Sequence, residues 1–80
     1  MKKIKIGIFG PSGRMGNDLI EQIKSFKSLE ISVLCEKKKH KDVGKRVSGI
    51  VIGDDINNLI KFSDVIIDFT IPSATINLLK

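Results

Sequence analysis

The stretch IKIGIFGPSGRMGNDLI, residues 4–20, decides the fold because its hydrophobic period changes in the middle. Residues 4–9 are mostly apolar and rich in isoleucine, which is typical of a strand buried on both faces of a sheet. From Gly16 onward the apolar side chains follow a helical stripe, at Leu19, Ile20, Ile23 and Phe26. The sequence therefore predicts a strand, a glycine-rich turn and a helix in direct succession.

The rest of the chain continues this alternation. Three short apolar runs predict further strands, over residues 31–35, 50–52 and 64–69. The segment DDINNLIKF predicts a helix with an aspartate N-cap and an apolar face, formed by Asp54 or Asp55 and by Ile56, Leu59 and Ile60. Pro72 and Ser73 are expected to open a final helix that runs to Lys80.

Strands and helices that alternate at this spacing predict a parallel sheet with right-handed crossovers. The expected fold class is α/β, with a Rossmann-like doubly wound parallel sheet. Four strands and an interrupted helix make about half of the larger version of that fold. We therefore expect residues 1–80 to be the N-terminal part of a dinucleotide-binding domain, with the C-terminal substrate domain absent from this chain.

Composition excludes several classes of protein. A hydrophobic content of 41% and a charged content of 29% are typical of a globular protein rather than a disordered or fibrous one. The apolar runs are too short for a membrane span or a signal peptide, so a cytoplasmic location is expected. A single cysteine, Cys35, excludes an internal disulfide and a multi-cysteine metal site, and no metal site is expected.

The net charge of +5 is concentrated in one segment around His40, with basic residues at Lys37, Lys38, Lys39, Lys41, Lys45 and Arg46. This segment is either a solvated loop or a site for an anion, such as nucleic acid, a membrane surface or a phosphorylated small molecule. Stacking on nucleic acid is disfavoured because the only aromatics are four phenylalanines, and Phe9, Phe26 and Phe62 are expected in the core. His40 itself is expected to be solvated.

Three glycines at a spacing of three, Gly10, Gly13 and Gly16, suit a dinucleotide-binding turn. In such a turn the first glycine allows a sharp bend, the second a close approach to the pyrophosphate, and the third close packing of the helix. The spacing differs from the usual G-x-G-x-x-G, because Ser12 stands at the usual second glycine. Glycine spacing alone is therefore weak support for a nucleotide site.

Two charged residues strengthen the nucleotide hypothesis. Arg14 lies at the start of the helix, where a cation opposes the helix dipole by about 0.3–1 kcal/mol and a bound anion would reverse the penalty. Glu36 follows the second strand, 20 residues after Gly16, where an acid can accept hydrogen bonds from the adenosine ribose. Because lysines follow at once, from Lys37, we expect both NAD and NADP to be accepted. The alternatives are an arginine turned into water and a glutamate that is only a surface charge.

The segments GPSGRMG and VIIDFTIPSATINLL, together with Glu36, resemble the N-terminal domain of the dihydrodipicolinate reductase family, also called 4-hydroxy-tetrahydrodipicolinate reductase. The resemblance implies hydride transfer from NADH or NADPH to a cyclic dicarboxylate in diaminopimelate and lysine biosynthesis. It also implies a pyrophosphate loop, a ribose-binding acid, a contact to the 2′-phosphate and a cofactor cleft. The resemblance places the pyrophosphate loop at Gly10, Pro11, Ser12, Gly13, Arg14 and Met15. It makes Glu36 the ribose-binding acid and Lys37 the contact to the 2′-phosphate. The cofactor cleft is lined by Asp68, Phe69 and Thr70.

The chain lacks the histidine-rich catalytic stretch and the nicotinamide loop of that family. We therefore expect no catalytic residue within residues 1–80 and no activity from them alone. The complete enzyme is expected to take a small dicarboxylate and to form homo-oligomers, without nucleic-acid or membrane partners. The alternatives are another NAD(P)-dependent dehydrogenase with a similar first domain, and a nucleotide-binding module without catalysis.

Overall fold

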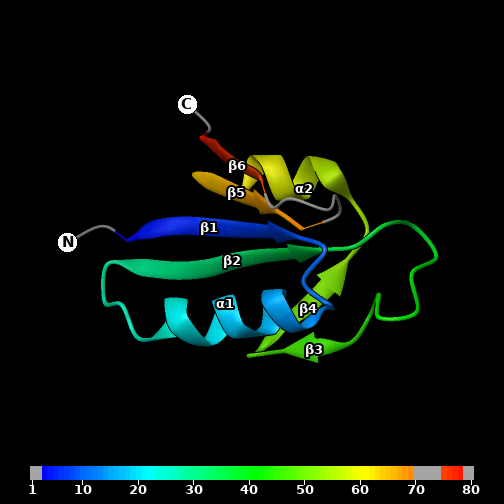
Figure 1. Ribbon diagram of the computed structural model, residues 1–80. Helices are drawn as coiled ribbons and strands as arrows, with labels where there is room; N and C mark the ends of the chain where they lie inside the picture. The colour runs from blue at the N-terminus through cyan, green and yellow to red at the C-terminus, as the bar shows by residue number, and fades with distance from the viewer. Residues whose placement is uncertain (1–2, 70–74, 79–80) are drawn as a thin grey trace.

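A computed structural model of the chain describes residues 3–69 and 75–78. In the described residues the chain forms one six-stranded sheet and two helices (Figure 1). In chain order the elements are β1 (Ile4–Phe9), α1 (Arg14–Lys24), β2 (Leu29–Cys35), β3 (Arg46–Val47), β4 (Ile50–Gly53), α2 (Ile56–Lys61), β5 (Val65–Asp68) and β6 (Thr75–Leu78). The expected α/β fold class is confirmed.

The centre of the sheet is parallel and its two edges are antiparallel. The strand order is β3-β4-β2-β1-β5-β6. Strand β1 pairs in parallel with β2 and β5, and β2 pairs in parallel with β4. The edge strands β3 and β6 run antiparallel to β4 and β5. All four central strands therefore place their carboxyl ends at one edge of the sheet.

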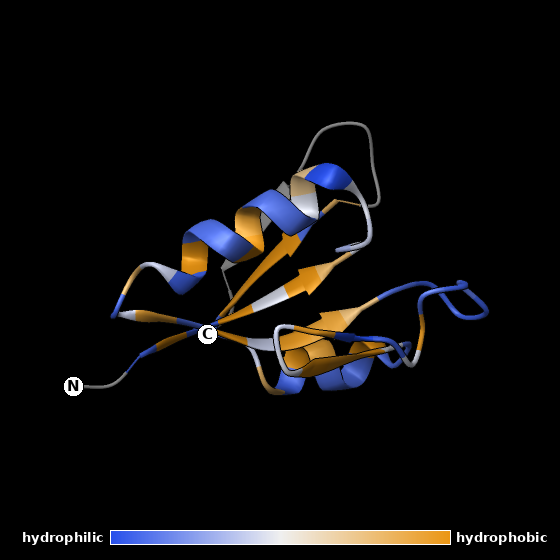
Figure 2. Cartoon of the chain, turned by 90° about the horizontal axis from the view of Figure 1, so that it is seen from below, coloured by the Kyte–Doolittle hydropathy of each residue, from blue (hydrophilic) through white to orange (hydrophobic). Residues whose placement is uncertain are grey.

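The two helices cover opposite faces of the sheet and turn their apolar sides toward it (Figure 2). Under α1 the larger core is formed by Ile6, Ile8, Ile20, Ile23, Leu34 and Ile52. Under α2 a smaller core is formed by Cys35, Leu59 and Ile66. None of the helices in the described part of the chain is long and apolar enough to cross a membrane.

Two phenylalanines expected in the core are exposed. Phe26 is 56% exposed because α1 ends at Lys24, two residues before it, and Phe62 is 47% exposed just after α2. Phe9 is half-buried and packs against the smaller core, as expected. The apolar stripe predicted for this helix therefore continued to Phe26, past Lys24, where α1 ends.

The helix expected near the end of the chain is wrong. Thr75–Leu78 forms strand β6, with Thr75 opposite Asp68 and Leu78 opposite Val65. Its first two residues are β-branched, which favours a strand, and pairing supplies partners for the backbone at the edge of β5. Pro72 and Ser73 lie outside the described residues.

A hairpin that the sequence analysis did not predict forms the other edge of the sheet. Strands β3 and β4 are joined by Ser48 and Gly49, whose φ angles are 51° and 83°. Two consecutive positive φ angles in a two-residue loop are typical of a type I′ turn, whose twist suits a hairpin. The Ser48-Gly49 dipeptide is the sequence signal that could have revealed it.

The pairing of β1 with β2 contains one irregularity. Ile6 lies opposite Ile31, but Gly7 lies opposite Val33, so Ser32 is an extra residue of the kind found in a β-bulge. The Ser32 hydroxyl donates a hydrogen bond of 2.7 Å to the Phe62 carbonyl oxygen, which links the bulge to the end of α2. Bulges bend a strand and increase its twist.

Candidate functional site

The residues singled out from the sequence gather at the carboxyl edge of the parallel strands. The turn between β1 and α1 contains the glycines, the loop after β2 contains the lysines, and β5 ends beside them (Figure 1). In open α/β sheets, ligands bind outside this edge, where neighbouring connections leave in opposite directions. Here α1 leaves toward one face of the sheet and α2 toward the other.

The first and third glycines have the structural roles expected of them. Gly10 has a φ of 81°, a conformation that glycine adopts without strain, and its N–H donates to the Cys35 carbonyl at 2.8 Å. A Cβ on Gly16 would lie 2.5 Å from the Pro11 carbonyl oxygen, so only glycine lets α1 approach the turn this closely. Pro11 is itself fully buried at that contact.

Gly13 is different, because neither its backbone angles nor any contact in the described part of the chain requires a glycine there. Its φ of −84° is available to any residue, and a Cβ there would meet no atom within 4 Å. As the N-cap of α1 it also offers no side chain to the first N–H groups of the helix. The position therefore presents open space in front of a helix N-terminus.

The start of α1 suits an anion. Its first turn contains no acidic residue, and its first residues, Arg14 and Met15, are exposed. Uncapped N–H groups and the positive end of the helix dipole attract phosphate groups. A pyrophosphate is therefore compatible with this turn in both charge and space.

Glu36 is buried and faces the glycine-rich turn. Only 5% of it is exposed, and its Oε2 accepts a hydrogen bond of 3.0 Å from the Ser12 N–H. Its own N–H donates to the Gly53 carbonyl at 2.8 Å, which extends the pairing of β2 with β4. The alternative of a mere surface charge is wrong.

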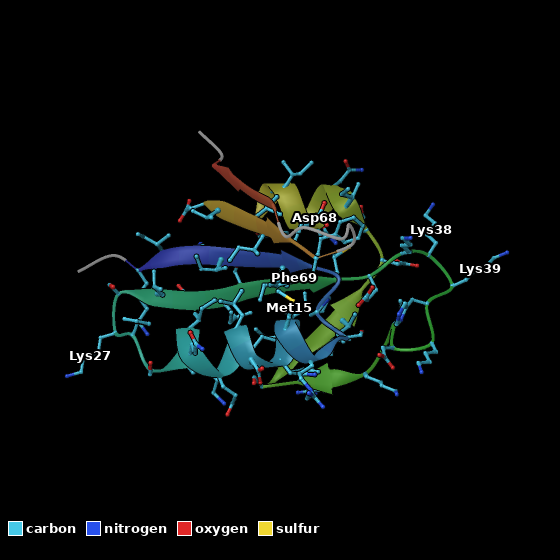
Figure 3. All side chains as sticks on the ribbon, viewed as in Figure 1. Met15, Lys27, Lys38, Lys39, Asp68 and Phe69 are labelled. Atoms are coloured by element: carbon cyan, nitrogen blue, oxygen red, sulfur yellow. The ribbon has the colours of Figure 1, made fainter. Side chains whose placement is uncertain are left out.

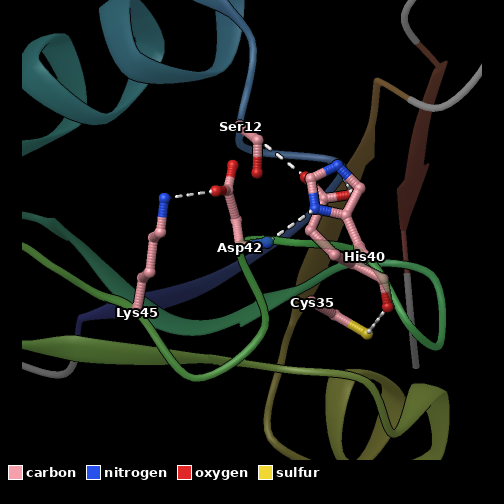
Figure 4. A network of polar contacts seen from close by, with 6 residues as sticks. Ser12, Cys35, His40, Asp42 and Lys45 are labelled. Carbon is pink, nitrogen blue, oxygen red and sulfur yellow. Dashed lines mark hydrogen bonds and ion pairs between the residues drawn. The ribbon is translucent and has the colours of Figure 1, made fainter.

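The basic loop after β2 folds back over the glycine-rich turn, and Figure 4 shows His40 and Asp42 of this loop beside Ser12. His40 Nε2 lies 3.8 Å from Glu36 Oε1, and His40 Nδ1 accepts a hydrogen bond of 3.0 Å from the Asp42 N–H. With only 30% of its side chain exposed, His40 is not the fully solvated residue that was expected. Sequence analysis missed its position because nothing in the basic run distinguishes it from its neighbours.

Asp42 is the second acid that this loop places near the glycine-rich turn. Lys45 Nζ lies 2.8 Å from Asp42 Oδ1. This hydrogen bond, the Ser12 hydroxyl and the nearby charges of Lys45 and His40 lower the pKa of Asp42 from its usual 3.8. The Ser12 hydroxyl is buried, faces Asp42 and makes no hydrogen bond of standard geometry. It is a polar group that a ligand in the turn could satisfy.

The three lysines directly after Glu36, unlike Lys45, make no side-chain hydrogen bond or ion pair within the described part of the chain. Lys37, Lys38 and Lys39 are all exposed, and Figure 3 shows Lys38 and Lys39 pointing away from the body of the protein. Lys39 has a φ of 67°, which marks a tight turn at the tip. The Lys37 carbonyl accepts a hydrogen bond from the His40 N–H at 3.0 Å. These cations are placed to add a diffuse positive field at the carboxyl edge of the sheet.

The end of β5 supplies the remaining predicted residues. Asp68 is its last residue and Phe69 follows, half-buried against the larger core (Figure 3). The Phe69 N–H donates to the Phe9 carbonyl at 2.8 Å, which fixes this backbone beside the glycine-rich turn. Thr70 lies outside the described residues. Within residues 3–69 and 75–78, no three histidine, cysteine, aspartate or glutamate side chains are grouped to hold a metal ion.

Comparison with known proteins gives one consistent result. A family model described as "Dihydrodipicolinate reductase, N-terminus" matches residues 4–80. A 4-hydroxy-tetrahydrodipicolinate reductase of Pelagibacter ubique is 40% identical over 80 residues, which are 100% of this chain and 30% of the relative. The protein of the same name in Buchnera aphidicola is 38% identical over 87 residues, covering 99% and 32%. That of Nitratiruptor is 39% identical over 77 residues, covering 96% and 29%.

The chain thus spans about a third of the length of the curated relatives that it matches. The family match includes the glycine-rich turn, Glu36 and the end of β5, which carried the resemblance seen in the sequence. That resemblance is confirmed, and the chain belongs to the dihydrodipicolinate reductase family, whose N-terminal region it matches.

Proposed function

We propose that this chain is the nucleotide-binding part of an NAD(P)H-dependent 4-hydroxy-tetrahydrodipicolinate reductase. The observation that carries the proposal is the hydrogen bond from the Ser12 N–H to the buried Glu36 carboxylate. It joins the turn suited to a pyrophosphate to an acid suited to a ribose, at the edge of the sheet where such folds bind nucleotides. Family membership adds the reaction, because the relatives carry the name of that reductase.

In this proposal the residues predicted from the sequence keep their roles. The turn of Gly10, Pro11, Ser12, Gly13, Arg14 and Met15 holds the pyrophosphate, and Glu36 accepts hydrogen bonds from the adenosine ribose. Lys37 faces a 2′-phosphate, and Phe69 and Thr70 line the cofactor cleft. Bound NADH or NADPH supplies the hydride. Residues 1–80 contain no catalytic residue, and the substrate domain that completes the enzyme lies outside them.

The same proposal covers the wider context. The complete enzyme acts on a small cyclic dicarboxylate in the diaminopimelate route to lysine, works in the cytoplasm and forms homo-oligomers. We expect no nucleic-acid partner, since exposed Phe26 is next to Lys27, which lies at the opposite end of the molecule from Lys38 and Lys39 (Figure 3). A stacking surface for bases would need an aromatic beside the basic loop.

The test is nucleotide oxidation by the complete protein that carries this chain. We expect NADH or NADPH to be oxidised with 4-hydroxy-tetrahydrodipicolinate and not with unrelated keto acids. Oxidation with the keto acids alone would assign the chain to another dehydrogenase. Nucleotide binding without oxidation of any kind would indicate a module that only binds.

A further inference from the structure

Ser12 stands where a dinucleotide-binding turn usually has its second glycine, and a glycine there allows the backbone to approach the pyrophosphate. A side chain at this position must therefore be kept out of the space in front of α1. The Ser12 hydroxyl oxygen is buried, whereas the next residue, Gly13, borders open space. The Ser12 side chain is thus turned away from the side on which a nucleotide would bind.

Two acidic residues face Ser12 from the neighbouring loop. Glu36 accepts a hydrogen bond of 3.0 Å from the Ser12 N–H. The Ser12 hydroxyl points toward the Asp42 carboxylate (Figure 4) and, after Lys45, is the next group that lowers the pKa of Asp42. It makes no standard hydrogen bond elsewhere in the described part of the chain. Glu36 therefore fixes the backbone of Ser12, and Asp42 is placed to fix its side chain.

The loop holds Asp42 in this place. Only 15% of its side chain is exposed, and its Oδ1 lies 2.8 Å from Lys45 Nζ. Its carbonyl accepts a hydrogen bond of 3.0 Å from the Lys45 N–H. Two hydrogen bonds of 2.8 Å join the loop to β4, from the Gly44 N–H to the Ile52 carbonyl and from the Ile52 N–H to the Lys45 carbonyl. Asp42 thus connects Ser12 to a part of the chain that is anchored on the sheet.

We propose that Asp42 is a positioning residue of the nucleotide site, which holds the Ser12 side chain away from the pyrophosphate and so allows a serine at the position of the second glycine. The inference rests on the proposed function, because it concerns the pyrophosphate of NAD(P)H. The charge of Asp42 alone would have the opposite effect, since an acid near the turn repels phosphate groups. Lys45 offsets part of this repulsion by pairing with the carboxylate.

The test compares Asp42→Ala in two backgrounds of the complete protein, the original one and Ser12→Gly, by the dissociation constants of NADH and NADPH. In the original background Asp42→Ala frees the Ser12 side chain and should raise both constants about tenfold, because the two nucleotides share the pyrophosphate. In the Ser12→Gly background no side chain remains to be held. There the same substitution should leave both constants unchanged, or lower them through the loss of a negative charge.

Three further variants separate positioning from charge and from folding. Asp42→Asn keeps an oxygen that can accept the Ser12 hydroxyl, so it should lose less affinity than Asp42→Ala. Asp54→Asn removes an exposed carboxylate just after β4 and should not weaken binding. Ser12→Ala also lacks the hydroxyl and provides a second background in which Asp42→Ala should have little effect. Urea midpoints establish that each variant is folded.

The outcomes distinguish the inference from its alternatives. The same loss of affinity in all backgrounds would show that Asp42 supports the loop rather than Ser12, and would overturn the inference. Unchanged or tighter binding by Asp42→Ala in the original background would overturn it as well, since only charge would then matter. Weaker binding of one nucleotide alone would place Asp42 at the ribose instead. Failure of the original protein to bind either nucleotide would overturn the proposed function too.

Discussion

Replacing Gly16 by alanine tests whether this glycine is needed for the packing of α1 against the turn, in contrast to Gly13, which leaves space for a nucleotide. In a helix, alanine is favoured over glycine by about 1 kcal/mol. The new Cβ would, however, lie 2.5 Å from the Pro11 carbonyl oxygen and 2.8 Å from its Cα and carbonyl carbon. Those atoms are backbone, so they cannot turn aside as a flexible side chain could.

The expected loss of stability follows from these two opposing effects. Overpacking costs about 1–3 kcal/mol, and a collision with backbone belongs at the upper end of that range. After subtraction of the gain in helix propensity, Gly16→Ala should lower the free energy of unfolding by about 2 kcal/mol. Urea denaturation of the complete protein measures this loss as a lower midpoint at an unchanged slope.

The matched control is Gly13→Ala, three residues earlier in the same turn. Its Cβ meets no protein atom within 4 Å, and its φ of −84° is available to alanine. The gain of about 0.4–1 kcal/mol from a less flexible unfolded chain is offset by a poorer N-cap, so stability should hardly change. Nucleotide affinity should fall, because the Cβ occupies the open space in front of α1.

The reasoning would be refuted if Gly16→Ala were as stable as the original protein. It would also be refuted if Gly13→Ala lost as much stability as Gly16→Ala, since the structure gives these positions opposite surroundings. Unchanged nucleotide affinity in Gly13→Ala would show that the ligand does not approach the turn at that point.

Three further predictions concern charges and the thiol. Glu36→Ala should weaken NADH binding by about 1.5–3 kcal/mol, while NADPH affinity holds or rises. Lys37→Ala should weaken the binding of NADPH alone, and this effect should be smaller at high salt. Equal effects of either variant on both nucleotides would contradict the assignment. Because the pKa of Asp42 is lowered from 3.8, its stabilising contribution is present above that pH and is lost as the pH falls through the folded value. Urea midpoints of Asp42→Asn should therefore fall less steeply than those of the original protein below pH 3.8, and parallel curves would contradict this. Burial and the nearby charges of Asp54, Asp55 and Glu36 raise the pKa of Cys35, so its alkylation, followed by mass spectrometry, should be slow until urea unfolds the protein.

The central elements could be predicted from sequence because each has a clear pattern of apolar residues, and α2 also has a recognisable N-cap. Strand β1 coincides with the predicted residues 4–9, and α2 begins at Ile56 after the predicted cap Asp55, whose side chain accepts from the Asn57 N–H at 2.9 Å. The edge strands escaped prediction because pairing with a neighbour decides them. Strand β3 has only two residues, and one of them is Arg46.

The candidate site was predictable in its residue types but not in its contacts. Local spacing indicated the turn and placed Glu36 after a strand. It could not show that Glu36 is buried against the Ser12 N–H, because that contact spans 24 residues of sequence. Nor could it distinguish His40 from the exposed lysines, since the turn that directs its imidazole inward depends on the hydrogen bond from Asp42.

The extra residue Ser32 in β2 decides where Glu36 points. Before it, Leu29 and Ile31 pack into the core under α1; after it, Leu34 does so, while Val33 and Cys35 pack on the α2 side. The bulge therefore changes the inward series from odd to even numbers, and Glu36 continues the even series toward the turn that leads into α1. A β2 strand without Ser32 would either turn Leu29 and Ile31 out of the core or turn the carboxylate to the opposite face. The direction of the Glu36 side chain is thus set four residues before it, by an irregularity in the backbone of β2.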